Sequence, residues 1–264
     1  MTEGLARLMD LTQAGLAGFL LVFVRIGAIA ALLPGFSEQA IPPRVRLAVA
    51  FSFAMVVWPM VTPGLGDLAA SATDPARPFA GMLLIEALIG LMLGIAIRLM
   101  VMALQLAGAI AAQSTALAQI FGAGITPDPM PAIGNILMLA GITLAVASGL
   151  HVKAALAMAR SYEILPMGLP VPADDIARWG TARVAQAFAL GFSLAAPFVI
   201  AGFAYNLALG AINRAMPQMM VAFIGAPAIT AAGLLLLLLA SPVILHFWGL
   251  RLDRLLADPL AMPR

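Results

Sequence analysis

The sequence contains no cysteine and few charged residues, and both shortages limit what kind of protein it can encode. Without cysteine, disulfide bonds, thiolate metal sites and thiol nucleophiles are excluded. Asp, Glu, Lys and Arg make up only 10% of the 264 residues, whereas about a quarter is typical of soluble domains. Hydrophobic residues account for 63%, so the polar side chains are too few to cover a soluble protein of this size. We therefore predict one integral membrane domain spanning residues 1–264.

The sequence patterns that mark catalytic and nucleotide sites are also missing. It has no HExxH, no P-loop and no GxSxG. The two histidines, His151 and His246, lie far from each other and from any acid at ligand spacing. The net charge is only +2 and its cations are scattered, which argues against a nucleic-acid partner. We expect no enzyme activity, no cofactor and no metal.

Long apolar stretches are what the sequence has in abundance. A transmembrane helix needs about 20 predominantly apolar residues, and hydropathy predicts about six crossings. Prolines and glycines fall at the joints and inside the stretches, which favours kinks and breaks. We therefore predict an all-α, polytopic membrane protein of bent helical hairpins. The stretches are 11–36, 47–66, 79–127, 129–150, 184–213 and 215–250.

Four charged residues interrupt these stretches: Arg25, Glu86, Arg98 and Arg214. An ionised side chain at the bilayer centre costs at least about 2.5–3.5 kcal/mol on insertion scales. Each must therefore pair within the chain, reach the membrane interface, or face another chain or a lumen. Glu86 and Arg98 lie about 18 Å apart along one helix, so they cannot pair directly on it. For Arg25 and Arg98, a side chain that reaches the membrane interface is as good an explanation as pairing or contact with another chain.

A polar joint is predicted near the centre of the most apolar region. Proline at position 217 breaks the helix, and broken backbone at membrane depth must be buried in protein or line a cavity. Neighbouring amides and a guanidinium can hydrogen-bond to the carbonyls that the break frees. Glycines on either side allow close helix packing. The joint comprises Asn206, Gly210, Asn213, Arg214, Pro217, Gln218 and Gly225.

Several strings of the sequence, in order, resemble those of the FliR family. SEQAIPPRVRLAVA at 37–50 is similar to the family segment S-E-x-x-I-P-x-R-V-x-L. NLALGAINRAMPQMMVAFIGAP at 206–227 is similar to N-L-x-L-G-x-x-N-R-x-x-P-Q followed by G-x-P. The stretch 108–131 and the LPMG loop at 165–168 add shorter matches. The chain departs from the family pattern at Ala109, Met220, Ala222 and Ala226.

The resemblance implies a structural and gating subunit of the flagellar type III protein-export channel, related to the SctT virulence-secretion family. Its expected partners are FliP-like and FliQ-like gate subunits, FlhB- and FlhA-like components, unfolded flagellar protein substrates and membrane lipid. The fold would join a FliP-like part, about 1–180, to a FliQ-like part, about 181–264. The expected location is the bacterial inner (cell) membrane, in the flagellar basal body. A small-solute secondary transporter with discontinuous helices is the alternative.

The resemblance also implies roles for individual residues. A loop at about 113–126 would plug the central pore, and it contains Gln113, Leu117, Ile120, Phe121 and Thr126. The two longest matching strings would pack against neighbouring subunits. From these we add Glu38, Pro42, Arg44 and Pro227 to the residues of the polar joint.

Overall fold

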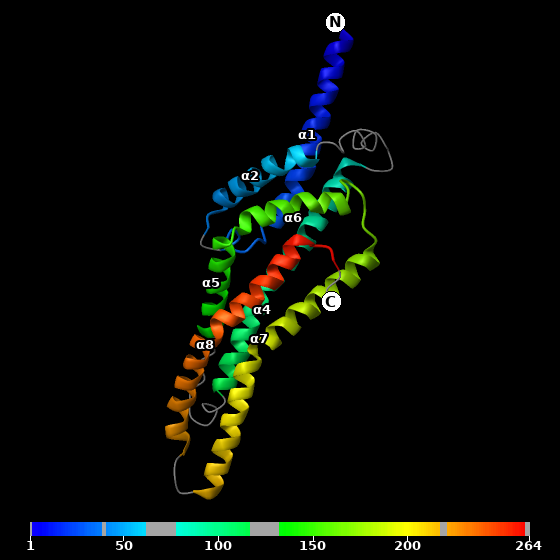
Figure 1. The fold of residues 1–264 in the computed structure, drawn as a ribbon. Helices are drawn as coiled ribbons and strands as arrows, with labels where there is room; N and C mark the ends of the chain where they lie inside the picture. Colours follow the sequence, from blue (N-terminus) through cyan, green and yellow to red (C-terminus); the bar gives the residue numbers. More distant parts are fainter. Residues whose placement is uncertain (1, 39–40, 62–77, 117–131, 217–220, 262–264) are drawn as a thin grey trace. The chain divides into compact units, whose positions relative to one another are not determined.

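A computed structural model describes residues 2–38, 41–61, 78–116, 132–216 and 221–261, and its secondary structure over these ranges is helical, without a strand. The side chains of 2–14, 221–224, 226 and 227 are not described. Figure 1 shows the helices in chain order. They are α1 (Thr2–Ala30), α2 (Pro43–Val61), α4 (Phe79–Ala116), α5 (Ala132–Ala147), α6 (Leu150–Ile164), α7 (Ala173–Ala215) and α8 (Val221–Ala257).

Membrane-spanning capacity is concentrated in α2, α4, α7 and α8. Within the described residues, these four helices are long and apolar enough to cross a membrane. The pair α5 and α6 makes a fifth candidate if its two helices form one broken span. A shorter apolar helix, Gly15–Ala30, lies within α1. The predicted all-α, polytopic fold is confirmed.

The break between α5 and α6 bends the chain by 76°. Gly149 at this break has a φ of 81°, in the left-handed region where a side chain would be strained. Its carbonyl accepts the first backbone hydrogen bonds of α6, from Val152 and Lys153. Glycine therefore permits one helix to end and the next to begin without an intervening loop.

The chain divides into two compact units, and α4, α5, α7 and α8 contribute to both. The first unit contains Met1–Arg98, Val146–Arg183 and Leu252–Arg264. In it, α2 packs against α1 and α6 (Figure 1). Phe19 of α1 meets Phe51 and Trp58 of α2 edge to face, at centroid distances of 5.7 and 5.8 Å. Such aromatic pairs add stability beyond the area they bury.

The second unit contains Leu99–Ala145 and Val184–Arg251. In it α7 and α8 form an antiparallel hairpin (Figure 1). Trp248 of α8 is fully buried, and its indole Nε1 donates a hydrogen bond of 2.7 Å to the Met100 carbonyl of α4. Helices α4 and α5 cross in direct backbone contact at Gly108 and Gly134. Glycine at position 108 permits this approach, because a Cβ on Gly108 would overlap the Gly134 backbone.

Candidate functional site

A buried ion pair joins α1 to α4 inside the first unit. Arg25 Nε donates to Glu86 Oε2 at 2.6 Å, and Arg25 Nη2 donates to Glu86 Oε1 at 3.1 Å. Both side chains are 0% exposed. The two parallel N–H···O contacts are the geometry in which a guanidinium and a carboxylate bind most strongly. Two of the four interrupting charges therefore neutralise each other within the chain.

The remaining hydrogen-bonding capacity of this pair is used by α6 and by the segment after it. Arg25 Nη1 donates to the Leu165 carbonyl at 3.0 Å and lies 3.4 Å from the Ser161 carbonyl and hydroxyl oxygens. Glu86 Oε1 accepts a hydrogen bond of 2.8 Å from the backbone N–H of Gly168. The Arg25 guanidinium also lies 3.9 Å from the centre of the Tyr162 ring, within cation–π range.

This cluster, which we call the Arg25 cluster, connects three helices and the α6–α7 connection through one charged pair. It comprises Arg25, Glu86, Ser161, Tyr162, Leu165 and Gly168. Gly168 has a φ of 72°, so a backbone shape that favours glycine turns its N–H towards the carboxylate. The LPMG loop singled out in the sequence therefore helps to hold the ion pair.

A second ion pair fixes the connection between α1 and α2. Arg98 Nη1 lies 2.9 Å from Glu38 Oε1, and both side chains are about one-third exposed. Arg46 donates to the Glu38 carbonyl at 2.7 Å and to the Ile41 carbonyl at 3.0 Å. The predicted packing residue Glu38 thus has a partner inside its own chain. Pro42 accepts the first backbone bonds of α2 and is exposed, as is Arg44.

The predicted polar joint is only partly described. Helix α7 ends at Ala215, two residues before the proline expected to stop it, while Pro217 and Gln218 lie outside the described residues. Asn206 donates a hydrogen bond of 2.8 Å to the Gly202 carbonyl of its own helix. Gly210, Asn213 and Arg214 are exposed. Over the described part of the chain, the structure does not bring these polar side chains together.

A tyrosine that the sequence analysis did not single out joins the two arms of the hairpin. The Tyr205 hydroxyl of α7 donates a hydrogen bond of 2.5 Å to the Gly225 carbonyl of α8. A Cβ on Gly225 would lie 2.6 Å from that hydroxyl, which gives the predicted packing glycine a role inside the chain. The side chain of Pro227 lies outside the described residues. No sequence signal distinguishes Tyr205, because its partner is a backbone atom.

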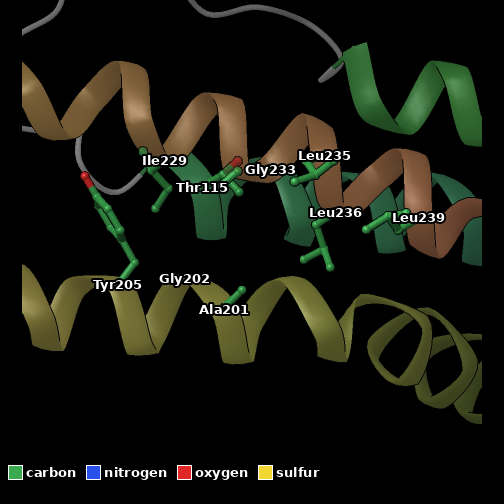
Figure 2. A pocket seen from close by; sticks show the side chains of 10 residues that line it. Thr115, Ala201, Gly202, Tyr205, Ile229, Gly233, Leu235, Leu236 and Leu239 are labelled. Carbon is green, nitrogen blue, oxygen red and sulfur yellow. The ribbon is translucent and has the colours of Figure 1, made fainter.

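An apolar cavity of about 230 Å³ lies between α7 and α8, next to the end of α4 (Figure 2). Gly202 of α7 lets Ser114 approach, and a Cβ on Gly233 of α8 would lie 2.9 Å from Thr115 Cγ2. The Thr115 hydroxyl lies 3.0 Å from the Ala112 carbonyl of its own helix. Because the polar atoms that line the cavity are already hydrogen-bonded, it suits apolar atoms rather than a polar solute.

The predicted pore plug lies mostly outside the described residues, which do not include Leu117, Ile120, Phe121 and Thr126. Gln113 is described, and it is exposed in the last turn of α4 rather than in a loop. The helix continues to Ala116 because residues 106–116 contain no proline and, apart from Gln113, are apolar or small. In the part of the chain that the structure describes, no three His, Asp or Glu residues are grouped to hold a metal ion.

Comparison with known proteins gives matches over almost the whole chain. Residues 16–255 match the family model described as bacterial export proteins, family 1. The chain is 35% identical over 239 residues to the flagellar biosynthetic protein FliR of Caulobacter vibrioides, covering 89% of this chain and 93% of the relative. It is 29% identical to FliR of Aquifex aeolicus, with 85% of each chain covered. It is also 27% identical to the Yop proteins translocation protein T of Yersinia pestis, with 96% of each covered.

Proposed function

Because this chain belongs to bacterial export protein family 1, with FliR and its virulence-secretion relatives, we propose that it is a structural and gating subunit of the flagellar type III protein-export channel. Family membership and the membrane-capable helices indicate a membrane subunit of a type III export apparatus. We further propose that this subunit assembles with FliP-like and FliQ-like subunits into a pore for unfolded substrates. The similarity to FliR over 89% of the chain carries this proposal.

The distribution of charged and apolar side chains supports a role in an assembly. Three of the four charges inside apolar stretches are paired within the chain, and the Arg25–Glu86 pair is fully buried. Large hydrophobic side chains are exposed along the long helices, such as Phe203 at 71% and Leu238 at 70%. Surfaces of this kind pack against other membrane subunits or acyl chains. A channel subunit needs such packing surfaces and no catalytic centre.

The family resemblance is the basis for proposing the internal organisation of the chain, its neighbours and its location. We propose a FliP-like part at about 1–180 and a FliQ-like part at about 181–264, with FlhB- and FlhA-like components nearby. The proposed location is the bacterial inner membrane, within the flagellar basal body. The identity of 35% to FliR of Caulobacter vibrioides, against 27% to the Yop protein, favours flagellar over virulence export.

Co-purification tests the proposed assembly. The tagged chain is expressed with and without the FliP-like and FliQ-like proteins of its own organism, and each preparation is purified in mild detergent. We expect all three proteins to elute together in a fixed stoichiometry measured by native mass spectrometry. An untagged chain with the same partners provides the background. A stable homodimer that binds a small solute and retains neither partner would instead support the transporter alternative.

The proposed pore plug makes a separate prediction about ion leakage. Deleting residues 118–124 should raise the membrane conductance of vesicles containing the assembled complex, because the bulky segment that closes the pore is removed. Conductance is measured at constant complex density, with a Gly4-Ser insertion after Ser71 as a control for a change of chain length elsewhere. Unchanged conductance in a fully assembled complex would show that this segment does not close the pore.

A further inference from the structure

A second groove, of about 350 Å³, lies in the second unit between α4, α5 and α7. Most of its lining is apolar, including Met102, Leu106 and Phe188. Two amide side chains interrupt this lining: Gln105 of α4 and Asn135 of α5. Both are half-buried. We refer to this feature as the amide groove.

The two amides are poorly satisfied within the chain. Gln105 Nε2 lies 2.7 Å from the thioether sulfur of Met138, which is a weak acceptor. Among the residues that the structure describes, none is hydrogen-bonded to the Asn135 side chain. Other polar side chains on the same helices behave differently, since Thr143 of α5 donates to the Leu139 carbonyl at 2.8 Å. The amide groove therefore has unused donors and acceptors.

These amides are held in fixed positions by the crossing of α4 and α5. Gln105 precedes the crossing residue Gly108 by about one helical turn, and Asn135 directly follows the other crossing residue, Gly134. The backbones touch at this point, so neither helix can rotate to hide its amide without separating from the other. The amides therefore remain directed towards whatever occupies the groove.

The chemistry of the amides selects the occupant. Helix α4 contains a 37-residue candidate span, and an amide without a hydrogen-bonding partner in hydrocarbon is strongly unfavourable. Acyl chains have no hydrogen-bonding groups, so lipid would leave this penalty in place. A neighbouring helix can fill the apolar part of the groove and also present a hydroxyl or amide to the two side chains.

We propose that the amide groove receives a transmembrane helix of another export-gate subunit, through a side chain bearing a hydroxyl or amide that hydrogen-bonds to Gln105 and Asn135. This proposal rests on the proposed function, because it takes a co-assembling subunit as the partner. It assigns to Asn135 and Gln105 the recognition of that subunit rather than the stability of the isolated chain.

The test compares co-purification of the partner subunits with Asn135→Leu, Gln105→Leu and the double variant. Each lost interhelical hydrogen bond should weaken partner binding about three- to twenty-fold, measured as partner retained during dilution in detergent. Asn135→Ser, which supplies a hydroxyl in place of the amide, should retain most of the binding. Thr143→Val is the matched control on α5, because its hydroxyl is already used by its own helix. The midpoint for thermal unfolding of the isolated chain should be unchanged in every variant.

A cross-linking experiment identifies the occupant. The chain has no cysteine, so Met102→Cys at the groove places a single thiol there, which is labelled with benzophenone maleimide and photolysed in the assembled complex. We expect a cross-link to a transmembrane segment of a partner subunit. Cross-links only to lipid, or only to a second copy of this chain, would overturn the proposal. If the unaltered chain co-purifies with its partners and the double variant does so equally well, the groove proposal fails while the proposed function stands.

Discussion

Glu86→Leu is expected to lower the free energy of unfolding by about 3–5 kcal/mol, because it leaves a buried guanidinium without its counter-ion. Arg25 is 0% exposed, so its charge cannot reach water by a change of side-chain conformation. The substitution also removes the acceptor of the Gly168 N–H. Unfolding is measured by denaturant titration in mixed micelles, followed by tryptophan fluorescence.

Two further variants separate the buried charge from the loss of a contact. Arg25→Met combined with Glu86→Leu removes both charges and should recover most of the lost stability, because no unpaired ion remains. Glu38→Ala breaks the half-exposed pair with Arg98 and should cost only about 0–1 kcal/mol. If Glu86→Leu were no more destabilising than Glu38→Ala, the Arg25 cluster would not be an important source of stability.

Gly108→Ala is expected to destabilise the chain by about 1–3 kcal/mol, because the added methyl group overlaps the backbone of Gly134 at the crossing of α4 and α5. Neither helix can yield locally, since the contact is between backbones. The change would be measured as a lower midpoint for thermal unfolding of the purified chain in detergent. It should also disturb the neighbouring amide groove, so partner binding should fall with stability.

Gly249→Ala is a control for which we expect no loss of stability, or a gain. A Cβ at this position of α8 would meet nothing within 4 Å, and alanine is favoured over glycine in a helix by up to about 1 kcal/mol. The control variant should therefore keep or raise the unfolding midpoint. Equal effects of the two substitutions would contradict a close backbone crossing at Gly108.

Much of the helical architecture could be predicted because it depends on local composition. The apolar stretches predicted helices, and helices occupy most of the residues that the structure describes in them. The end of α7 at Ala215, just before Pro217, follows from the inability of proline to continue a helix. The plug loop was expected to begin at Gln113, but α4 continues to Ala116. The family assignment was equally available, because it rests on ordered strings of residues.

Hydropathy and motif order are properties of the linear chain, so they were enough to predict an all-α membrane protein of an export family. How its charges are neutralised depends on the way the helices pack. Arg25 and Glu86 lie 61 positions apart, and Arg98 pairs with Glu38 rather than with an acid on its own helix. A charge in an apolar stretch shows that a partner is needed, but it does not show which one. The partner is chosen by how α1, α4 and α6 pack, and packing depends on residues distant in the sequence.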